Sequence, residues 1–253
     1  MNPSFLSLPD REAKPRKRGL TILLDGGVPE GMFEDIIDNY HQIVDFVKFG
    51  WGTCLVSGNL DSKISKLRSR NIDYFFGGTL FEKALFQNAL DKYCEFLREK
   101  NCSYVEISNG TIELSNEEKC MHIKKFSNEF HVFSEVGYKD LGKSLNMHPT
   151  EWIKCINQDK TAGAFKVITE ARESGKSGIC RGDGEIRFGL MEEIFHSELD
   201  QNEIIFEAPR KDLQSYFINR AGPNVNLANI AFEDIIGLET LRLGLRSDTF
   251  FLK

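Results

Sequence analysis

Short apolar runs of strand length alternate along the chain with amphipathic stretches of helical length. The apolar runs cover residues 20–25, 43–49, 72–76, 103–107, 130–136, 164–169, 203–206 and 224–228. Helical patterns lie between them, at residues 31–42, 61–70, 80–99, 115–127, 149–159, 188–197, 210–220 and 232–246. Such alternation without a break in composition predicts an α/β fold of the (β/α)8 TIM-barrel class. The second interpretation is an open doubly wound sheet, although no Gly-x-Gly-x-x-Gly motif follows the first run.

Two stretches fall outside this alternation. Residues 1–18 are polar and include a basic run, and we expect a flexible N-terminal segment ahead of a single barrel domain at 19–253. Residues 171–187, between the sixth run and its helix, are rich in glycine and charge. We expect them to form a loop over the barrel mouth or a small hairpin.

The composition is that of an ordinary soluble globular protein, with 41% hydrophobic and 28% charged residues. The net charge of −6 argues against nonspecific binding to nucleic acid or to an anionic membrane. The cysteines show no Cys-x-x-Cys or Cys-x-His spacing, so they indicate reduced thiols of a cytoplasmic chain. No apolar run reaches the length of a membrane span.

Glutamates recur near the ends of four successive apolar runs. Glu106, Glu135, Glu170 and Glu207 each lie late in their run, and the C-terminal strand ends of a barrel form its active site. Several carboxylates at one barrel mouth are costly unless cations compensate them. A divalent metal is the simplest compensating ion, and hard oxygen ligands favour Mg²⁺. The alternative is a network of ion pairs with lysines and arginines at the same mouth.

A lysine followed by two glycines ends the second run. Lys48 lies among apolar residues, where an unpaired ammonium is costly. Gly50 and Gly52 allow a sharp turn, and Thr53 offers a hydroxyl beside free backbone N–H groups. The stretch predicts a binding site for a phosphate or carboxylate. The alternative is a structural turn with a lysine that extends to solvent.

Other candidates for anion binding follow later runs. The turn Arg172-Glu173-Ser174-Gly175-Lys176 places two cations around a Ser-Gly pair. Arg210 begins a helix, where a cation is unfavourable for the helix dipole, and this favours a role facing an anion. Asp25 ends the first run. Asn224 and Asn226 alternate on the eighth run, so both are expected to face the barrel interior.

With these residues assembled, the chain resembles the phosphosulfolactate synthase family, (β/α)8 enzymes of coenzyme M biosynthesis. The likeness extends from about Arg18 to Phe250. The motifs that together carry it are Arg18–Thr21, Val47–Thr53, Gly77–Glu82, Val105–Ser108, Glu135–Gly137, Arg172–Lys176, Glu207–Pro209, Asn224–Ile230 and Glu239–Arg242.

The resemblance implies a lyase that uses Mg²⁺ to add sulfite to phosphoenolpyruvate, giving (R)-2-phospho-3-sulfolactate. It implies that Lys139 is the acid that protonates C2, with Lys48 and Glu106 as further catalytic residues. Glu135, Glu170 and Glu207 are then expected to hold Mg²⁺. The expected partners are small molecules, with a homo-oligomer left open. The expected substrate-binding residues are Asp25, Thr53, Arg172, Ser174, Gly175, Lys176, Arg210, Asn224 and Asn226.

Four positions depart from the family pattern. Gly26 stands where the family usually has a lysine, Asn109 where it has an aspartate, Tyr138 where it has the first of two lysines, and Ser247 where it has a glycine. Two of these departures remove a cation from the surroundings of an anionic substrate pair. Two alternatives therefore stay open: a diverged barrel enzyme that adds another nucleophile to phosphoenolpyruvate or a similar phosphorylated acid, and a non-catalytic relative.

Overall fold

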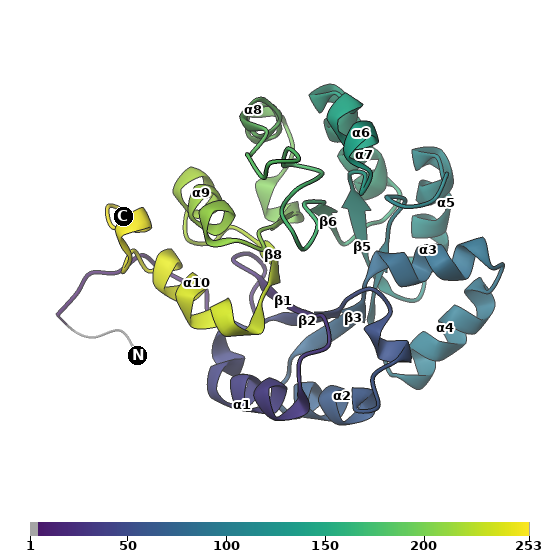
Figure 1. The fold of residues 1–253 in the computed structure, drawn as a ribbon, viewed down its shortest axis with the longest axis horizontal. Coiled ribbons are helices and arrows are strands. Elements are labelled where there is room, and N and C mark those ends of the chain that lie inside the picture. The colour runs from purple at the N-terminus through teal and green to yellow at the C-terminus, as the bar shows by residue number, and fades with distance from the viewer. Residues whose placement is uncertain (1–4, 253) are drawn as a thin grey trace.

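The computed structural model describes residues 5–252 and contains a sheet of eight parallel strands surrounded by helices (Figure 1). The sheet order is β3-β2-β1-β8-β7-β6-β5-β4. Two hydrogen bonds link the ends of β3 and β4 and nearly close the ring: the Gly78 N–H, just after β3, donates to the Glu106 side chain on β4, and the Cys102 thiol, just before β4, donates to the Tyr74 carbonyl on β3. The predicted TIM-barrel class is confirmed. The strands are β1 (Thr21–Asp25), β2 (Phe46–Phe49), β3 (Asp73–Phe76), β4 (Tyr104–Ile107), β5 (His131–Val136), β6 (Lys166–Thr169), β7 (Ile204–Glu207) and β8 (Leu227–Ile230).

The helices follow the predicted pattern with two differences: one predicted helix is divided, and α6 (Leu141–Asn146) lies where no helix was predicted. The helix expected over 80–99 is two helices, because Asn88 adopts a left-handed backbone (φ 54°) between them. The helices are α1 (Glu30–Tyr40), α2 (Leu60–Ser69), α3 (Gly78–Phe86), α4 (Leu90–Glu99), α5 (Asn116–Phe126), α6 (Leu141–Asn146), α7 (Pro149–Thr161), α8 (Phe188–His196), α9 (Lys211–Ala221) and α10 (Ile235–Arg242).

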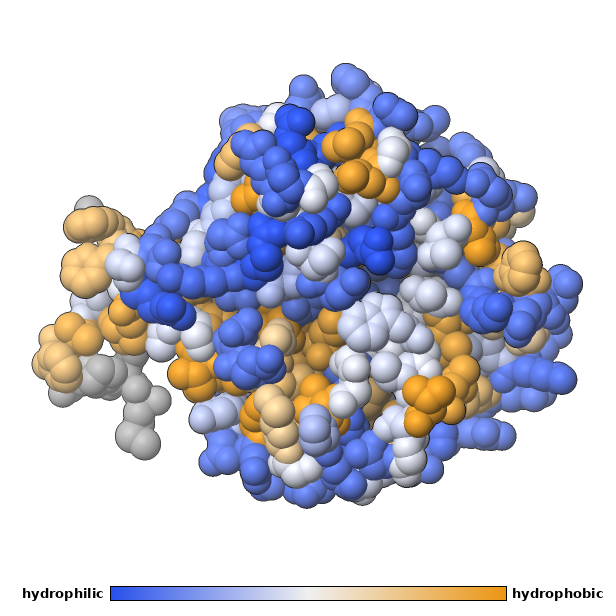
Figure 2. Space-filling model, viewed as in Figure 1, coloured by the Kyte–Doolittle hydropathy of each residue, from blue (hydrophilic) through white to orange (hydrophobic). Residues whose placement is uncertain are grey.

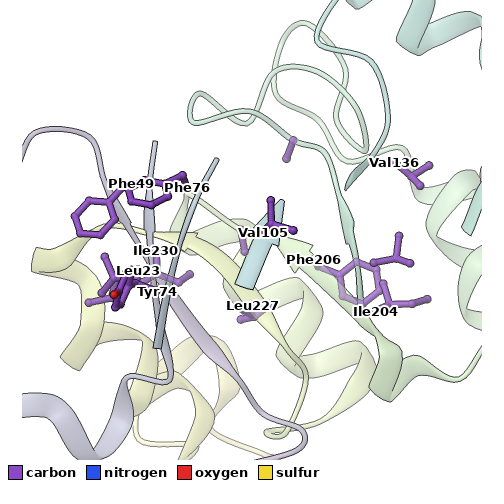
Figure 3. Close-up of a cluster of buried hydrophobic side chains, with 14 of the residues drawn as sticks. Leu23, Phe49, Tyr74, Phe76, Val105, Val136, Ile204, Phe206, Leu227 and Ile230 are labelled. Atoms are coloured by element: carbon purple, nitrogen blue, oxygen red, sulfur yellow. The ribbon is translucent and has the colours of Figure 1, made fainter. Parts of the chain in front are cut away.

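Two apolar layers support the barrel. The outer layer packs the strands against the helices, and Figure 3 shows part of it, including Leu23, Leu227 and Ile230. The inner layer fills the barrel itself, because alternate residues of a strand point to opposite faces of the sheet. It comprises Leu20, Ile22, Phe46, Phe75, Phe133, Ile168, Ile205 and Ala228, together with the partly buried Tyr104, which packs against them.

Ion pairs hold residues 11–18 against the N-terminal end of the barrel. Arg11 Nε lies 3.0 Å from a carboxylate oxygen of Glu239, and Arg16 Nη1 lies 3.1 Å from Asp45. The Arg16 and Asp45 side chains are each only 5% exposed. A buried, paired charge of this kind is costly to break. Part of the segment that was expected to be flexible is therefore bound to the barrel.

Residues 171–187 form a turn and a small hairpin near the C-terminal strand ends. Cys180 and Ile186 form an antiparallel bridge, and the Arg181 N–H donates to the Glu185 carbonyl. The expected small hairpin is therefore present. The surface in the view of Figure 2 is mainly hydrophilic with scattered apolar side chains. Among residues 5–252, no helix combines the length and the apolar character needed to cross a membrane.

Candidate active site

One residue at or just after the C-terminal end of each strand lines a cavity at the mouth of the barrel. On seven strands this residue lies two positions after a residue of the inner layer, as strand alternation requires. The four glutamates and Lys48 thus open into one cavity. The eight mouth residues are Leu24, Lys48, Gly77, Glu106, Glu135, Glu170, Glu207 and Asn229.

Lys48 is buried at the centre of three carboxylates. Its Nζ lies 2.8 Å from Glu106, 3.4 Å from Glu207 and 3.5 Å from Glu135. Glu106 also accepts the Gly78 N–H at 2.5 Å, and Glu207 accepts the Ala171 N–H at 2.8 Å. Lys48 is therefore paired inside the barrel and does not extend to solvent, and it joins strands β2, β4, β5 and β7.

Lys139 lies at the edge of the same cavity. Its Nζ lies 2.7 Å from Glu135 and 2.9 Å from Glu170, and its side chain is 24% exposed. It follows β5, and its backbone N–H donates to the Gly110 carbonyl. Lys139 can therefore reach both the carboxylates and a molecule that enters from the mouth.

The ionisable groups of the cavity have pKa values that burial and neighbouring charges shift in different directions. Burial alone would lower the pKa of Lys48 and of Lys139, but the adjacent carboxylates outweigh it and raise both above the usual value. Burial also raises the pKa of Glu106 to about 7, against the opposing effect of Lys48. Burial and Glu135 raise the pKa of Glu170, whereas Lys139 and Lys48 overcome burial and lower the pKa of Glu135. Both lysines are therefore ammonium groups at neutral pH.

Glu106→Gln is expected to reduce the loss of stability that accompanies rising pH. The folded-state pKa of Glu106, about 7, lies above its ordinary value of 4.5, so its protonated form stabilises the fold. That stabilisation is present below the ordinary pKa and is lost as the pH rises through the folded pKa. Between about pH 5 and about pH 8, the free energy of unfolding should fall by roughly 2–3 kcal/mol more in the parent than in the variant. Urea unfolding at both pH values measures this, and equal losses would contradict it.

Three of the carboxylates form a cluster suited to a cation. One carboxylate oxygen from each of Glu135, Glu170 and Glu207 lies within 4.8 Å of the others, and all three residues are buried. They come from β5, the end of β6, and β7, three neighbouring strands. Among residues 5–252, Glu170 Oε2 has no hydrogen-bond partner, although the Lys139 ammonium lies 2.9 Å away as an ion pair. The cluster comprises the three residues that the sequence assigned to metal binding.

Asp25 and Thr53 lie near the cavity but do not line it. Asp25 pairs with Lys63 of α2 at 2.6 Å and accepts the N–H groups of Gly27 and Val28. The Thr53 hydroxyl donates to the Asp25 carbonyl at 3.4 Å. Asp25 therefore shapes the turn after β1. Lys63 was missed from sequence, although it is three residues after Leu60, on the apolar face of its helix.

The glycine-rich turn after β6 is only partly at the cavity. Arg172 lines the rim, with a left-handed backbone (φ 61°) and its N–H donating to Glu170. Ser174 and Lys176 are exposed and do not line the cavity, and Gly175 is covered by the side chain of Arg210.

Arg210 holds this turn from the side. Its guanidinium donates to the Gly175 carbonyl at 2.9 Å and to the Gly184 carbonyl at 2.8 Å, and it pairs with Asp212. Arg210 thus fixes the loop over the mouth, a role that explains its place at the start of α9.

Asn224 and Asn226, two of the expected substrate-binding residues, do not lie at the cavity. The eighth strand begins at Leu227, so both asparagines precede it and lie at the opposite end of the barrel. Asn224 accepts from Arg11, and Asn226 accepts the Leu20 N–H and donates to the Ile204 carbonyl. Both side chains form hydrogen bonds at the N-terminal end of the barrel, on the other side of the inner layer from the cavity. The asparagine of this strand that reaches the cavity is Asn229.

Trp51 occupies the space beside Gly26, the most distinctive departure from the family pattern. A Cβ atom on Gly26 would lie 2.6 Å from the indole ring. Trp51 is 50% exposed, has a left-handed backbone (φ 49°) and lines the cavity rim. Of the other departures, Asn109 donates to the Leu114 carbonyl, and the Lys143 ammonium lies over the ring of Tyr138 outside the cavity. The sequence did not single out Trp51.

Comparison with known proteins gives consistent results. The family model described as (2R)-phospho-3-sulfolactate synthase (ComA) matches residues 9–248. A phosphosulfolactate synthase of Bacillus subtilis (strain 168) is 52% identical over 252 residues, covering 100% of both chains. The phosphosulfolactate synthase of Methanothermobacter thermautotrophicus is 41% identical, covering 98% of each chain.

Among solved structures, the YdjI aldolase from Escherichia coli K12 has the same fold, with a TM-score of 0.53 at 12% identity. The match covers 86% of this chain and 76% of that one. At this identity the likeness concerns the fold alone. The family model and the full-length relatives confirm the resemblance noted from sequence. The chain therefore belongs to the phosphosulfolactate synthase family of enzymes.

Proposed function

We propose that the protein adds sulfite to phosphoenolpyruvate, with Mg²⁺ bound at the buried carboxylates, to give (R)-2-phospho-3-sulfolactate. The observation that carries this proposal is the single buried cavity in which Lys48 and Lys139 face four glutamates at the strand ends. Two protonated lysines can stabilise an anionic transition state, and the carboxylates keep them protonated.

The donor set fits Mg²⁺. Glu135, Glu170 and Glu207 offer oxygen atoms within 4.8 Å of one another, and hard oxygen ligands suit this ion. Four carboxylates face two ammonium groups, so ionisation of all of them leaves an excess of negative charge that a divalent cation would neutralise. When bound, Mg²⁺ would act as a Lewis acid toward the developing carboxylate charge.

Lys139 supplies the proton in the proposed reaction. The sulfur of sulfite attacks C3 of phosphoenolpyruvate, and the C2–C3 π electrons move into the carboxylate, giving an aci-carboxylate. The Lys139 ammonium then donates its proton to C2, where the electron pair returns to form the C–H bond. Lys48 holds the adjacent carboxylates in place and contributes fixed positive charge. Arg172 at the rim is suited to the phosphate group.

Phosphoenolpyruvate and sulfite need more space than the inner cavity alone provides. That cavity has a volume of about 30 Å³, room for roughly two water molecules. A vestibule of about 430 Å³ adjoins it and shares Leu24, Trp51, Glu173 and Asn229 with it. We propose that the reacting carbons lie at the carboxylates and that the rest of the substrate pair extends into the vestibule.

The direct test is to incubate the purified protein with phosphoenolpyruvate, sulfite and Mg²⁺ and to follow the phosphorus NMR spectrum. We expect a new phosphate-ester resonance that appears only with sulfite and has the chemical shift of authentic 2-phospho-3-sulfolactate. Consumption of phosphoenolpyruvate only with another nucleophile would instead support the diverged enzyme, and no reaction with any nucleophile would support the non-catalytic relative.

Glu170→Gln is expected to weaken Mg²⁺ binding by more than about 10-fold, because it removes one of three carboxylate ligands. Titration calorimetry on the chelator-treated protein measures the affinity, and the shift of the melting temperature with Mg²⁺ checks it independently. Glu193→Gln is the matched control, since Glu193 is exposed on α8. Equal affinities in both variants would exclude Glu170 as a ligand.

A further inference from the structure

We propose that Asn229 is a substrate-binding residue, whose side-chain amide hydrogen-bonds an anionic oxygen of the phosphorylated acid at the junction of the inner cavity and the vestibule. The inference rests on the proposed function, because that function supplies the phosphorylated acid. It assigns a specific role to the one neutral polar side chain among the eight mouth residues, which are otherwise charged, aliphatic or glycine.

A β-bulge directs Asn229 into the cavity. On the other seven strands the mouth residue lies two positions after the inner-layer residue, but on β8 the inner-layer residue is Ala228 and the mouth residue is the next one along. The pairing with β1 shows the cause: Thr21 pairs with Leu227 and Leu23 with Ile230, so β8 uses one extra residue. Bulges of this kind re-aim side chains and are frequent beside active sites.

Without the bulge, strand alternation would bring Ile230 to the mouth and turn Asn229 toward the helices. Ile230 instead packs in the outer layer with Leu23 and Leu227 (Figure 3). An aliphatic side chain is thereby removed from the cavity, and an amide takes its place. The irregularity of β8 thus changes the chemistry of the mouth at a single position.

The backbone of Asn229 is left-handed, with φ 58°. Residues other than glycine rarely adopt this conformation, and strained backbone is concentrated at functional sites. Asparagine tolerates it better than most residues, so the backbone alone could account for the residue type. The side chain therefore has to be considered separately.

The Asn229 amide lacks a protein partner where one is expected. The residue is 6% exposed, and its Oδ1 is buried without a hydrogen-bond donor among the residues that the structure describes. An unpaired buried amide atom costs free energy, and such groups in folded proteins usually have a partner. Because Asn229 lines both the inner cavity and the vestibule, its Nδ2–H groups can donate to an anionic oxygen of a bound substrate, whereas Oδ1, which only accepts, would take its donor from a hydroxyl or a water molecule bound beside the substrate.

A neutral amide is also the appropriate group at this position. Glu207 is the neighbouring mouth residue on β7, and its carboxylate lies within 3.4 Å of Lys48. Another carboxylate would repel an anionic substrate, whereas another ammonium would compete with Lys48 for the same oxygens. An amide offers two N–H donors without changing the charge of the cavity.

Two substitutions separate substrate binding from a purely structural role. Asn229→Gly keeps the left-handed backbone and removes the amide, whereas Asn229→Asp keeps the shape and the tolerance of that backbone but adds a negative charge. If the residue only supports the bulge, Asn229→Gly should bind substrate as the parent does. If it contacts an anionic oxygen, Asn229→Gly should weaken binding and Asn229→Asp should weaken it further.

Calorimetry with phosphoenolpyruvate and Mg²⁺ measures binding, and steady-state kinetics with sulfite give kcat and KM. For Asn229→Gly we expect the dissociation constant for phosphoenolpyruvate to rise about 10- to 100-fold, the effect of losing one hydrogen bond to a charged group. Asn88→Gly is the matched control, because Asn88 is also left-handed (φ 54°) but is exposed between α3 and α4. It should bind as the parent does.

Melting temperatures of all the variants show whether the fold is retained. Parent-like affinity in Asn229→Gly would overturn the inference. The binding measurement also separates it from the proposed function: if the parent binds phosphoenolpyruvate but makes no product with sulfite, the proposed function fails, and the Asn229 variants still decide this inference. A parent that does not bind phosphoenolpyruvate would overturn both.

Discussion

Lys139→Ala is expected to lower turnover by about 10²–10⁴-fold, the usual contribution of a placed proton donor. Lys139 is the lysine at the edge of the cavity, within 2.9 Å of two carboxylates that keep it protonated. Without its ammonium, C2 would have to take a proton from water. Binding of phosphoenolpyruvate should change much less than turnover, because Lys48 and Arg172 remain. Single-turnover kinetics with sulfite, together with calorimetry, measure the two effects separately.

Two further variants complete this test. Lys143→Ala removes a nearby exposed lysine that pairs only with Glu113 in the described structure, and it should keep the parent rate. Lys139→Arg retains the positive charge beside Glu135 and Glu170 but holds its proton too tightly to donate it. It should therefore bind substrate and remain slow. An unchanged rate in Lys139→Ala would refute the role of Lys139 as the acid.

The barrel could be predicted from sequence because its strands are short and regular. On seven strands, an inner-layer apolar residue is followed two positions later by the mouth residue, as in Phe133 and Glu135 or Ile205 and Glu207. This period of two is a local property of the chain. The recurrence of late-strand glutamates was therefore sufficient to predict that they share one cavity.

The eighth strand shows the limit of the same reasoning. The asparagines at 224 and 226 have the alternation of a strand, yet they serve as caps for the barrel base. The bulge that brings Asn229 to the mouth depends on the pairing of β8 with β1, more than 200 residues away in sequence. Periodicity within one segment contains no information about that register. The position of Trp51 could not be predicted for a similar reason, because its indole ring occupies space that is free only when residue 26 is glycine.

The partners of the buried lysines also could not be predicted from the sequence. Lys63 and Lys48 are both buried lysines at the C-terminal end of the barrel, but one pairs with Asp25 in support of a turn and the other with three glutamates in the cavity. The residue types are the same, and only the geometry separates a structural pair from a site. The alternative of an ion-pair network at the mouth and the hypothesis of a metal site are therefore compatible, since the same carboxylates take part in both.

Lys48→Met is expected to have the largest effect on stability. The substitution removes the only ammonium within 4 Å of Glu106 or Glu207 among residues 5–252, and it leaves both carboxylates buried. Breaking a buried ion pair by removing one partner costs about 3–5 kcal/mol. The free energy of unfolding in urea at about pH 7 should fall by that amount, and turnover should be lost as well.

The pH dependence and a second substitution identify the cause of this loss. In Lys48→Met, the orphaned carboxyls can avoid buried charge only by binding protons, so the pKa of Glu106 should rise above its parent value of about 7. The variant should then lose less free energy of unfolding at about pH 5 than at about pH 8, because protonation of the carboxyls is complete at the lower pH.

Adding Glu106→Gln to Lys48→Met should restore part of the stability, since it removes the carboxylate nearest to the missing ammonium, at 2.8 Å in the parent. A loss that is independent of pH and unaffected by Glu106→Gln would instead indicate a packing defect from the shorter side chain.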